Sequence, residues 1–182
     1  MAVRRKMIRR IVEELLDKHQ IKEPPVDVKK ICEAIGLSVV RKDVESISGF
    51  IVQNDGKAVI GVNSSNVPAR QRFTIAHELG HYLLHPPGTD DVHVDSEFDV
   101  RFRDELSSQG TDKSEQEANF FAAELLMPQE FIEADLRNVG KIDLDGEFLI
   151  QGFLNDLAQK YEVSSQALLI RLTNLGVINS RL

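Results

Sequence analysis

Apolar residues repeat at helical spacing near both ends of the chain, and short runs typical of strands lie between them. In the first 19 residues they recur every three or four positions, which indicates a helix with one buried face. Pro24-Pro25 ends this helix, and VDVKKICEAIGL then predicts a short helix closed by Gly36. The apolar face of the first helix comprises Val3, Met7, Ile8, Ile11, Val12, Leu15 and Leu16.

Two segments before residue 64 are typical of β-structure. The stretch SVVRKD predicts a strand. The stretch GFIVQNDGKAVIGVN predicts a hairpin, because two β-branched runs flank the turn-forming residues Asn54, Asp55 and Gly56.

The rest of the chain is predicted to be mainly helical. Pro68 fits the first turn of a long helix that runs to about Leu84, before Pro86-Pro87. Further helices are predicted around residues 114–127, 128–138, 147–160 and 164–175. The order of helices, small sheet and helices predicts an α+β domain.

The length of 182 residues suits one compact domain with its own hydrophobic core. We expect a single domain over residues 1–182, in which three parts follow one another. They are an N-terminal amphipathic helix (1–22), a central core (23–138) and a C-terminal helical segment (139–182). Residues 86–112 are polar, acidic and rich in turn formers, so this connection is either disordered or functional, such as a flap over a cleft.

Charge and cysteine content argue against several classes of protein. Twenty-two basic and 29 acidic side chains give a net charge of −7, which does not favour a dedicated nucleic-acid-binding protein. No apolar run approaches the length of a membrane span. Cys32 is the only cysteine, so an intrachain disulfide is excluded and a reducing, cytoplasmic setting is favoured. Its position in an amphipathic stretch indicates a small buried hydrophobe.

The basic N-terminus resembles a targeting sequence only at first sight. Glu13, Glu14 and Asp17 follow the arginines, where a transit peptide stays poor in acidic residues. We therefore expect a permanent helix with a solvated basic face. Contact with a membrane or an acidic partner is the lesser alternative.

The strongest candidate for chemistry is the HELGH motif at residues 77–81, inside the predicted long helix. On a helix, His77 and His81 lie one turn apart on one face and can bind the same ion. Glu78 projects about 100° away, close enough to act on a metal-bound water. Metal-assisted peptide hydrolysis needs both metal ligands and a separate proton acceptor. The ion lowers the pKa of its bound water to about 7, and the carboxylate transfers the proton.

The motif can also occur by chance, with histidines that are merely buried. Here it lies in the largely apolar run FTIAHELGHYLLH, where two histidines and a glutamate would be costly to bury without a purpose. A metal site is therefore favoured, and it needs a third ligand.

Several residues could supply that ligand. A metzincin would need a glycine and a histidine at the positions of Leu84 and Pro87, so that class is excluded. His85 lies one further turn along the helix but precedes two prolines, so we assign it a supporting or substrate-facing role. His93 and Asp95 lie in the acidic segment and could approach the site. The remaining candidates are the glutamates of SEQEANFFAAELLMP, namely Glu115, Glu117 and Glu124.

Helical periodicity favours Glu115. It shares a stripe with Ala118, Asn119 and Ala122, whose small or polar side chains would let the two long helices approach closely. Asn119, one turn from Glu115, could hydrogen-bond a ligating imidazole and hold its tautomer.

The other two glutamates have plainer explanations. Glu117 faces another side of the helix and fits a capping box with Ser114, although Asp112 and Glu115 fit the same pattern. Geometry alone therefore leaves the choice open. Glu124, near the helix end, is expected to pair with solvent or with a basic neighbour.

With both segments in view, the chain resembles the ImmA/IrrE family of bacterial metallopeptidases. The likeness rests on PVDVKKICEAIGL, SGFIV…GKAVIGVN, PARQRFTIAHELGHYLLH, EQEANFFAAELLMP and LAQKYEVSSQALLIRLTNLGVI. It covers nearly all of residues 25–178. The presence of both H-E-L-G-H and E-x-x-x-N-x-F-A-A-E-L-L-M-P in one chain is specific to this family.

The resemblance implies a helix-rich, zincin-like domain with a small antiparallel sheet and the HExxH helix in its core. It implies a gluzincin-like site in which His77, His81 and Glu115 bind Zn²⁺ and Glu78 is the catalytic base. The donor set alone does not distinguish Zn²⁺ from Mn²⁺. Candidates for stabilising the oxyanion are Tyr82, His85, His93 and Arg103.

Characterised members of this family cut a helix-turn-helix repressor that is often encoded beside them. The resemblance therefore implies a cytoplasmic endopeptidase acting on such a protein, with no direct binding of nucleic acid or membrane. The alternative is a non-catalytic, metal-stabilised module that sequesters a repressor or a toxin.

The C-terminal stretch LAQKYEVSSQALLIRLTNLG itself imitates a helix-turn-helix. It carries only Lys160 and Arg171, with Arg181 beyond it, to contact phosphates. Two helices packing on a core produce the same pattern. We therefore predict a scaffold or protein-docking role for this segment.

Overall fold

The structure is a computed structural model in which residues 2–44, 47–54, 57–85, 92–96, 113–139 and 147–178 are described. At Asn54 and over residues 92–96, 138–139 and 147–151, only the backbone is described. Most of the 86–112 segment, including Arg103 and Asp112, lies outside the described residues, as does Arg181. The predicted flap therefore stays a prediction.

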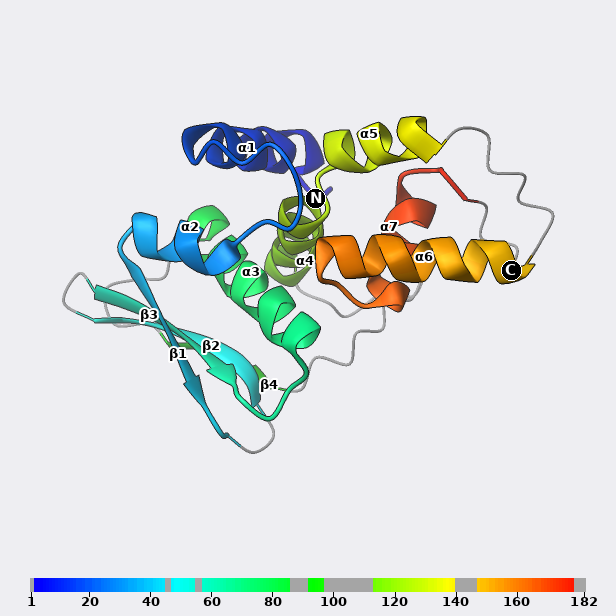
Figure 1. The fold of residues 1–182 in the computed structure, drawn as a ribbon. Coiled ribbons are helices and arrows are strands. Elements are labelled where there is room, and N and C mark those ends of the chain that lie inside the picture. The colour runs from blue at the N-terminus through cyan, green and yellow to red at the C-terminus, as the bar shows by residue number, and fades with distance from the viewer. Residues whose placement is uncertain are drawn as a thin grey trace.

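Within the described part of the chain, a four-stranded sheet forms one side of the molecule (Figure 1). Its strands are β1 (Leu37–Lys42), β2 (Ile47–Asn54), β3 (Lys57–Asn63) and β4 (Val92–Ser96), in the spatial order β1-β3-β2-β4. β2 and β3 are antiparallel, and Asn54, the last residue of β2, pairs with Lys57, the first residue of β3. The predicted hairpin is confirmed.

The sheet is mixed, whereas the sequence predicts an antiparallel one. β1 pairs in parallel with β3, from Leu37 opposite Ala58 to Lys42 opposite Asn63. The chain reverses once between β1 and β2 and again at the hairpin, so β1 and β3 run in the same direction. The sheet is mixed because β1 pairs with β3, to which it is parallel, and not with β2, to which it would be antiparallel.

β4 lies inside the segment that the sequence predicts as an irregular connection. It pairs antiparallel with β2, with Val92 opposite Val52 and Asp95 opposite Gly49. The pairing shifts register between Ile47 and Gly49, which marks an irregularity in β2. β4 forms one edge of the described sheet, and acidic and turn-forming neighbours conceal its short alternation in the sequence.

The HELGH motif lies on α3 (Pro68–Leu84), which contacts both the sheet and α4 (Lys113–Leu126) (Figure 1). Every residue of α3 from Thr74 to His81 is buried. At Gly80 the helices are so close that an added Cβ would lie 3.0 Å from Cδ1 of Phe121 and 3.2 Å from Cα of Ala118. The close approach predicted for the small residues of α4 occurs here, and the α+β class with the motif helix in its core is confirmed.

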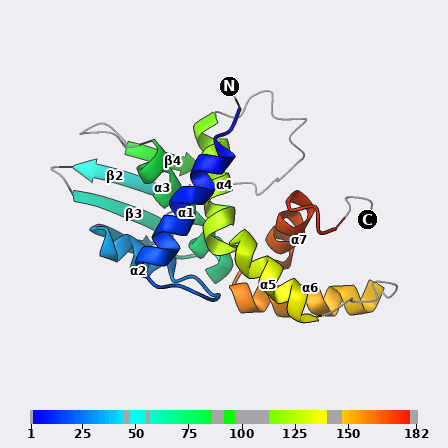
Figure 2. The same ribbon diagram turned by 90° about the horizontal axis from the view of Figure 1, so that it is seen from above.

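Two N-terminal helices pack on α3, α4 and the sheet and complete a hydrophobic cluster with them, which we call the first cluster. α1 (Arg5–Lys18) packs along α4 and buries Ile8, Val12 and Leu16, while Met7 remains 40% exposed at the edge of the predicted face (Figure 2). α2 (Val28–Ala34) packs on β1 and α3.

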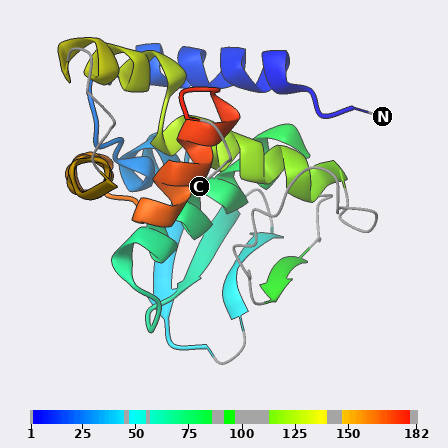
Figure 3. The ribbon, with the colours of Figure 1, turned by 90° about the vertical axis from the view of Figure 1, so that its right-hand side faces the viewer.

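The C-terminal helices form a second hydrophobic cluster beside the first (Figures 2 and 3). They are α5 (Gln129–Val139), α6 (Glu147–Tyr161) and α7 (Ser165–Asn174), at the positions that the sequence predicts. Ser164 caps α7 by accepting a hydrogen bond from the backbone N–H of Ala167 at 3.1 Å. The buried residues of this C-terminal cluster are Met127, Ile132, Leu154, Leu157, Ala158, Tyr161, Leu168 and Leu172.

Candidate metal centre

Three side chains from α3 and α4 bring their donor atoms together. His77, His81 and Glu115 each offer one ligand atom within 4.8 Å of the others. Both imidazoles are buried, and the Glu115 side chain is 23% exposed, so the group lies near the surface and one of its members is in contact with solvent. The structure thus brings together the three ligands that the resemblance implies.

The distances within this group suit a tetrahedral metal site. Nε2 of His77 and Nε2 of His81 are 2.9 Å apart, and they lie 3.4 and 3.1 Å from the carboxylate oxygens of Glu115. Metal–ligand bonds of about 2.0–2.2 Å at tetrahedral angles place neighbouring zinc ligands about 3.3 Å apart. The three side chains therefore fit a Zn²⁺ ion, and within the described residues no fourth protein donor joins them.

Glu78 lies between the motif helix and the sheet. It is fully buried, and its Oε1 is 3.6 Å from the position that a Cβ on Gly49 would occupy. That Cβ would also lie 2.2 Å from Cγ2 of Thr74 and 3.0 Å from the carbonyl oxygen of Gly61. Only a glycine lets β2 approach the helix this closely, so the backbone of β2 forms a wall beside Glu78.

His85 and Asn119, which the sequence predicts to support the ligands, do not contact the donor atoms in the way expected. His85 follows the last helical residue of α3, and its Nε2 lies 3.2 Å from Oε2 of Glu117, away from the three donor atoms. Asn119 is half-buried on α4, and within the described residues it makes no hydrogen bond to His77 or His81. Both roles stay predictions. For His93 and Asp95 only the backbone, as part of β4, is described.

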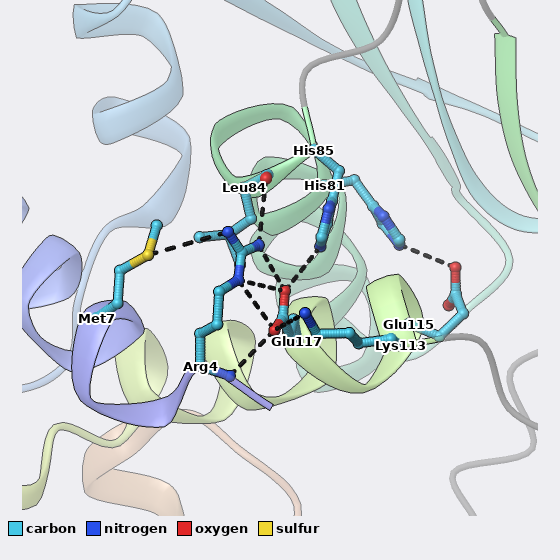
Figure 4. A network of polar contacts seen from close by, with 8 residues as sticks. All are labelled: Arg4, Met7, His81, Leu84, His85, Lys113, Glu115 and Glu117. Carbon is cyan, nitrogen blue, oxygen red and sulfur yellow. Dashed lines mark hydrogen bonds and ion pairs between the residues drawn. The ribbon is translucent and has the colours of Figure 1, made fainter. Parts of the chain in front are cut away.

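Sequence reasoning missed a cluster next to the site, centred on Glu117 (Figure 4). This carboxylate is fully buried. α4 begins at Lys113, so Ser114 lies inside the helix and is not the N-cap that a capping box with Glu117 would need. Its oxygens share one bifurcated hydrogen bond from Nε of Arg4, at 3.1 Å to each, and accept one from Nη2 at 2.6 Å and one from the Arg4 backbone N–H at 3.0 Å. Lys113 lies 3.5 Å away. We call Arg4, His85, Lys113 and Glu117 the Glu117 cluster.

The charge of Glu117 is strongly favoured in the folded protein. Hydrogen bonds from the Arg4 side chain, together with its backbone N–H and positive charge, lower the pKa of Glu117 to about 2 despite its burial. The same pairing raises the pKa of Arg4.

Glu124, two turns further along α4, is held in a comparable way. It is buried and lies 2.8 Å from Nη2 of Arg171 and 3.3 Å from Nε of Arg9, and it accepts the backbone N–H of Gln129 at 3.1 Å. Burial lowers the pKa of Arg171, and the charge of Glu124 opposes that shift. The expected basic neighbour is confirmed, but the pair lies inside the protein and not in solvent.

These pairs change the interpretation of the basic residues. Arg4 and Arg9 turn inward to α4, and Arg5 and Arg9 lie over the Phe120 ring at 5.7 and 5.6 Å, so the N-terminal basic face is only partly solvated. Arg171 is buried and paired, and Lys160 pairs with Asp135. The described basic residues of the helix-turn-helix-like segment therefore support packing within the chain.

Two further expectations can be compared with the structure. Cys32 is fully buried in the first cluster, as predicted, and burial raises its pKa to about 12. Its thiol is therefore protonated at neutral pH and packs as a small apolar side chain. Among the described residues, no helix is both long and apolar enough to cross a membrane.

Known proteins share this arrangement. Residues 32–173, well over half of the chain, match the family described as the IrrE N-terminal-like domain. An uncharacterized immunity region protein 2 of Bacillus phage phi105 is 28% identical over 159 residues, which cover 87% of this chain and 90% of that protein. Metallopeptidase ImmA of Bacillus subtilis is 24% identical over 157 residues, which cover 86% of this chain and 80% of its own.

Two longer proteins match in part. The radiation response metalloprotease IrrE of Deinococcus radiodurans is 35% identical over 115 residues, which cover 63% of this chain and 30% of that protein. A solved structure of a Mycobacterium tuberculosis transcriptional regulator matches 92% of this chain and 46% of its own, with a TM-score of 0.55 at 19% identity, which shows a shared fold alone. The family match and the two named metallopeptidases together establish that this chain belongs to the ImmA/IrrE family of metallopeptidases.

Proposed function

We propose that the chain is a zinc-dependent endopeptidase of the cytoplasm that cleaves a specific protein, a helix-turn-helix transcriptional repressor encoded near it. The observation that carries the proposal is the convergence of His77, His81 and Glu115, with the fully buried Glu78 next to His77 on the same helix. Family resemblance supplies the repressor as the class of substrate.

The donor set supports a catalytic centre over a structural one. Structural zinc sites are usually closed by four protein ligands, whereas catalytic sites keep one position for water or substrate. Within the described residues, three donors gather here. A Zn²⁺ ion held by them would act as a Lewis acid, polarising the peptide carbonyl and lowering the pKa of a bound water to about 7.

Glu78 suits the role of general base. Its backbone is adjacent to His77, and the wall formed by β2 at Gly49 restricts where the carboxylate can turn. We assign to Glu78 the removal of a proton from the attacking water and its delivery to the nitrogen of the leaving amine. Asn119, and His85 through the Glu117 cluster, would hold ligands in position, and no side chain is assigned to the oxyanion.

The sheet offers a place for an extended substrate. β4 is the edge strand next to the wall beside Glu78, because it pairs with β2 at Gly49, where an added Cβ would lie 3.6 Å from Oε1 of Glu78. An exposed edge strand can accept an extended peptide through main-chain hydrogen bonds. We propose that the 86–112 segment, of which β4 is part, borders the substrate cleft.

Replacing Glu78 tests the chemistry. In co-expression with a helix-turn-helix protein encoded beside it, the wild-type chain should produce discrete fragments of that protein. We expect Glu78→Gln to reduce cleavage by about 10²–10⁴-fold, because the proton acceptor is lost. Bound zinc, measured by elemental analysis of the purified protein, should be unchanged because Glu78 is not a ligand.

The exposed Glu33→Gln on α2 provides a matched control, since it changes the same chemical group outside the donor cluster, and cleavage should persist. Cleavage that survived in Glu78→Gln would contradict the mechanism. Binding of the repressor without fragments, in both the wild type and the variant, would instead indicate the non-catalytic module.

A further inference from the structure

The Glu117 cluster joins the N-terminus of α1 to both helices of the metal centre. Arg4 immediately precedes α1, Glu117 lies two residues from Glu115 on α4, and His85 lies one turn after His81. Arg4 also donates from Nη2 to the carbonyl oxygen of Leu84 at 3.5 Å, so one guanidinium contacts the ends of α3 and α4 together (Figure 4).

This bridge lies at the point where the two ligand-bearing helices must stay in register. His81 and Glu115 come from different helices, and their ligand atoms are only 3.1 Å apart. A small rotation or shift of α4 would carry Glu115 away from the imidazoles. Glu117 cannot follow such a movement freely, because it is fully buried and several of its hydrogen bonds come from Arg4.

We propose that Arg4 is a positioning residue of the metal centre: through Glu117 and the end of α3 it fixes the first turn of α4, and so holds Glu115 against His77 and His81. The inference rests on the metal site of the proposed function but not on peptidase activity. It gives the N-terminal helix a part in the centre, beyond covering the hydrophobic cluster.

The pair of Arg9 and Glu124 provides a matched comparison within the same two helices. Glu124 follows Glu117 by seven residues, on the same face of α4, and it too is buried and contacted by an arginine of α1. After loss of its α1 arginine, each glutamate keeps another cation: Lys113 beside Glu117, and Arg171 beside Glu124. Only the first pair lies next to a ligand. Arg4 also contacts Glu117 through its guanidinium and its backbone N–H, whereas Arg9 contacts Glu124 through Nε alone, at 3.3 Å.

The experiment compares Arg4→Met with Arg9→Met in the full chain. Affinity for Zn²⁺ is measured by competition with a chromophoric chelator, well below the melting temperature of each variant. Partners that orient metal ligands typically contribute about 10–100-fold to affinity, and for Arg4→Met we expect the lower end, about tenfold weaker binding. Arg9→Met should bind zinc like the wild type.

Cobalt(II) substitution gives a readout that general destabilisation does not change. The visible absorption of the bound Co²⁺ reports the ligand geometry, so the spectrum should change in Arg4→Met and stay as in the wild type in Arg9→Met. Arg4→Lys, which keeps the charge but not the two-pronged geometry, should give an intermediate zinc affinity. It also serves if Arg4→Met does not fold.

The outcomes separate the two proposals. Equal affinities and equal spectra for the wild type and Arg4→Met would overturn the inference, and so would equal losses in Arg4→Met and Arg9→Met. If Arg4→Met were unfolded, a zinc affinity of Arg4→Lys equal to that of the wild type would overturn it. A wild-type chain that bound no zinc would reject the metal site, and with it both proposals.

Discussion

The metal centre and the C-terminal cluster both bury titratable side chains, but they arrange them in opposite ways. Around the C-terminal cluster two carboxylates face hydrogen-bond donors: Glu124 lies between Arg9 and Arg171, and Asp135 accepts from Lys160 and Tyr161. In the metal centre, two imidazoles and a carboxylate direct atoms that can all bind a cation toward one point. Buried carboxylates that are paired with cations hold helices together, whereas buried atoms that converge without a cation between them form a site that can bind an ion.

Helix α4 contains both arrangements along its length. Glu124 at its end is neutralised by arginines, Glu115 at its start joins the donor group, and Glu117 between them is neutralised although it adjoins the centre. The type of residue is the same in all three cases, so its neighbours alone decide its role. This is why variants in the two regions should differ in their response to metal.

The largest contrast is expected from removal of a ligand. A metal that binds only the folded protein stabilises it by about 4 kcal/mol when its concentration is a thousand times the dissociation constant. In His81→Ala this gain in the free energy of unfolding should disappear, because two donors from different helices hold the ion poorly. Urea unfolding with and without Zn²⁺ measures the gain, and a gain equal to that of the wild type would show that His81 is not a ligand.

Arg171→Met should produce the opposite signature. Loss of one partner from a buried pair typically costs about 3–5 kcal/mol, and Arg9 and the backbone N–H of Gln129 should keep the cost near the lower value. The loss should be the same with and without zinc, since Arg171 contacts α4 at the end opposite Glu115. A specific loss of zinc affinity in this variant would end the proposed separation of the two regions.

Much of the fold and of the candidate site could be predicted from the sequence, because local patterns of residues determine them. The period of apolar residues located the helices, two β-branched runs located the hairpin, and the spacing within the HELGH motif selected His77 and His81. Each of these signals lies within one segment of about fifteen residues. Periodicity favoured Glu115, and the family resemblance decided between it and Glu117.

The features that the sequence did not reveal depend on contacts between distant segments. Arg4 and Arg9 looked like a solvated face because their partners, Glu117 and Glu124, lie more than 110 positions away. A signal was present, since two acids seven residues apart on α4 share one face and could meet a basic helix. The parallel position of β1 and the pairing of β4 are long-range in the same way, and no periodicity encodes them.

Gly49→Ala should sharpen the contrast at the wall of the site. The added methyl group would lie 2.2 Å from Thr74 and 3.6 Å from Oε1 of Glu78, so β2 and α3 must move apart. Overpacking of this kind costs about 1–3 kcal/mol. Because the change displaces the β2 wall beside Glu78, while α3 and α4 keep their positions relative to each other, kcat should fall and zinc affinity should persist, which chelator competition and a cleavage assay can separate. Unchanged kcat would remove Gly49 from the site.

Gly152→Ala is the counterpart in the C-terminal helices, with the smallest expected effect and the opposite sign. Gly152 is exposed on α6, and an added Cβ would meet no atom within 4 Å. Glycine within a helix costs about 0.5–1 kcal/mol relative to alanine, because it loses more backbone entropy on folding. Urea unfolding should therefore show a gain of that size, equal with and without zinc, and cleavage should be unaffected. A loss of stability would mean that α6 needs glycine at this position, and a change in zinc binding would couple the C-terminal helices to the metal centre.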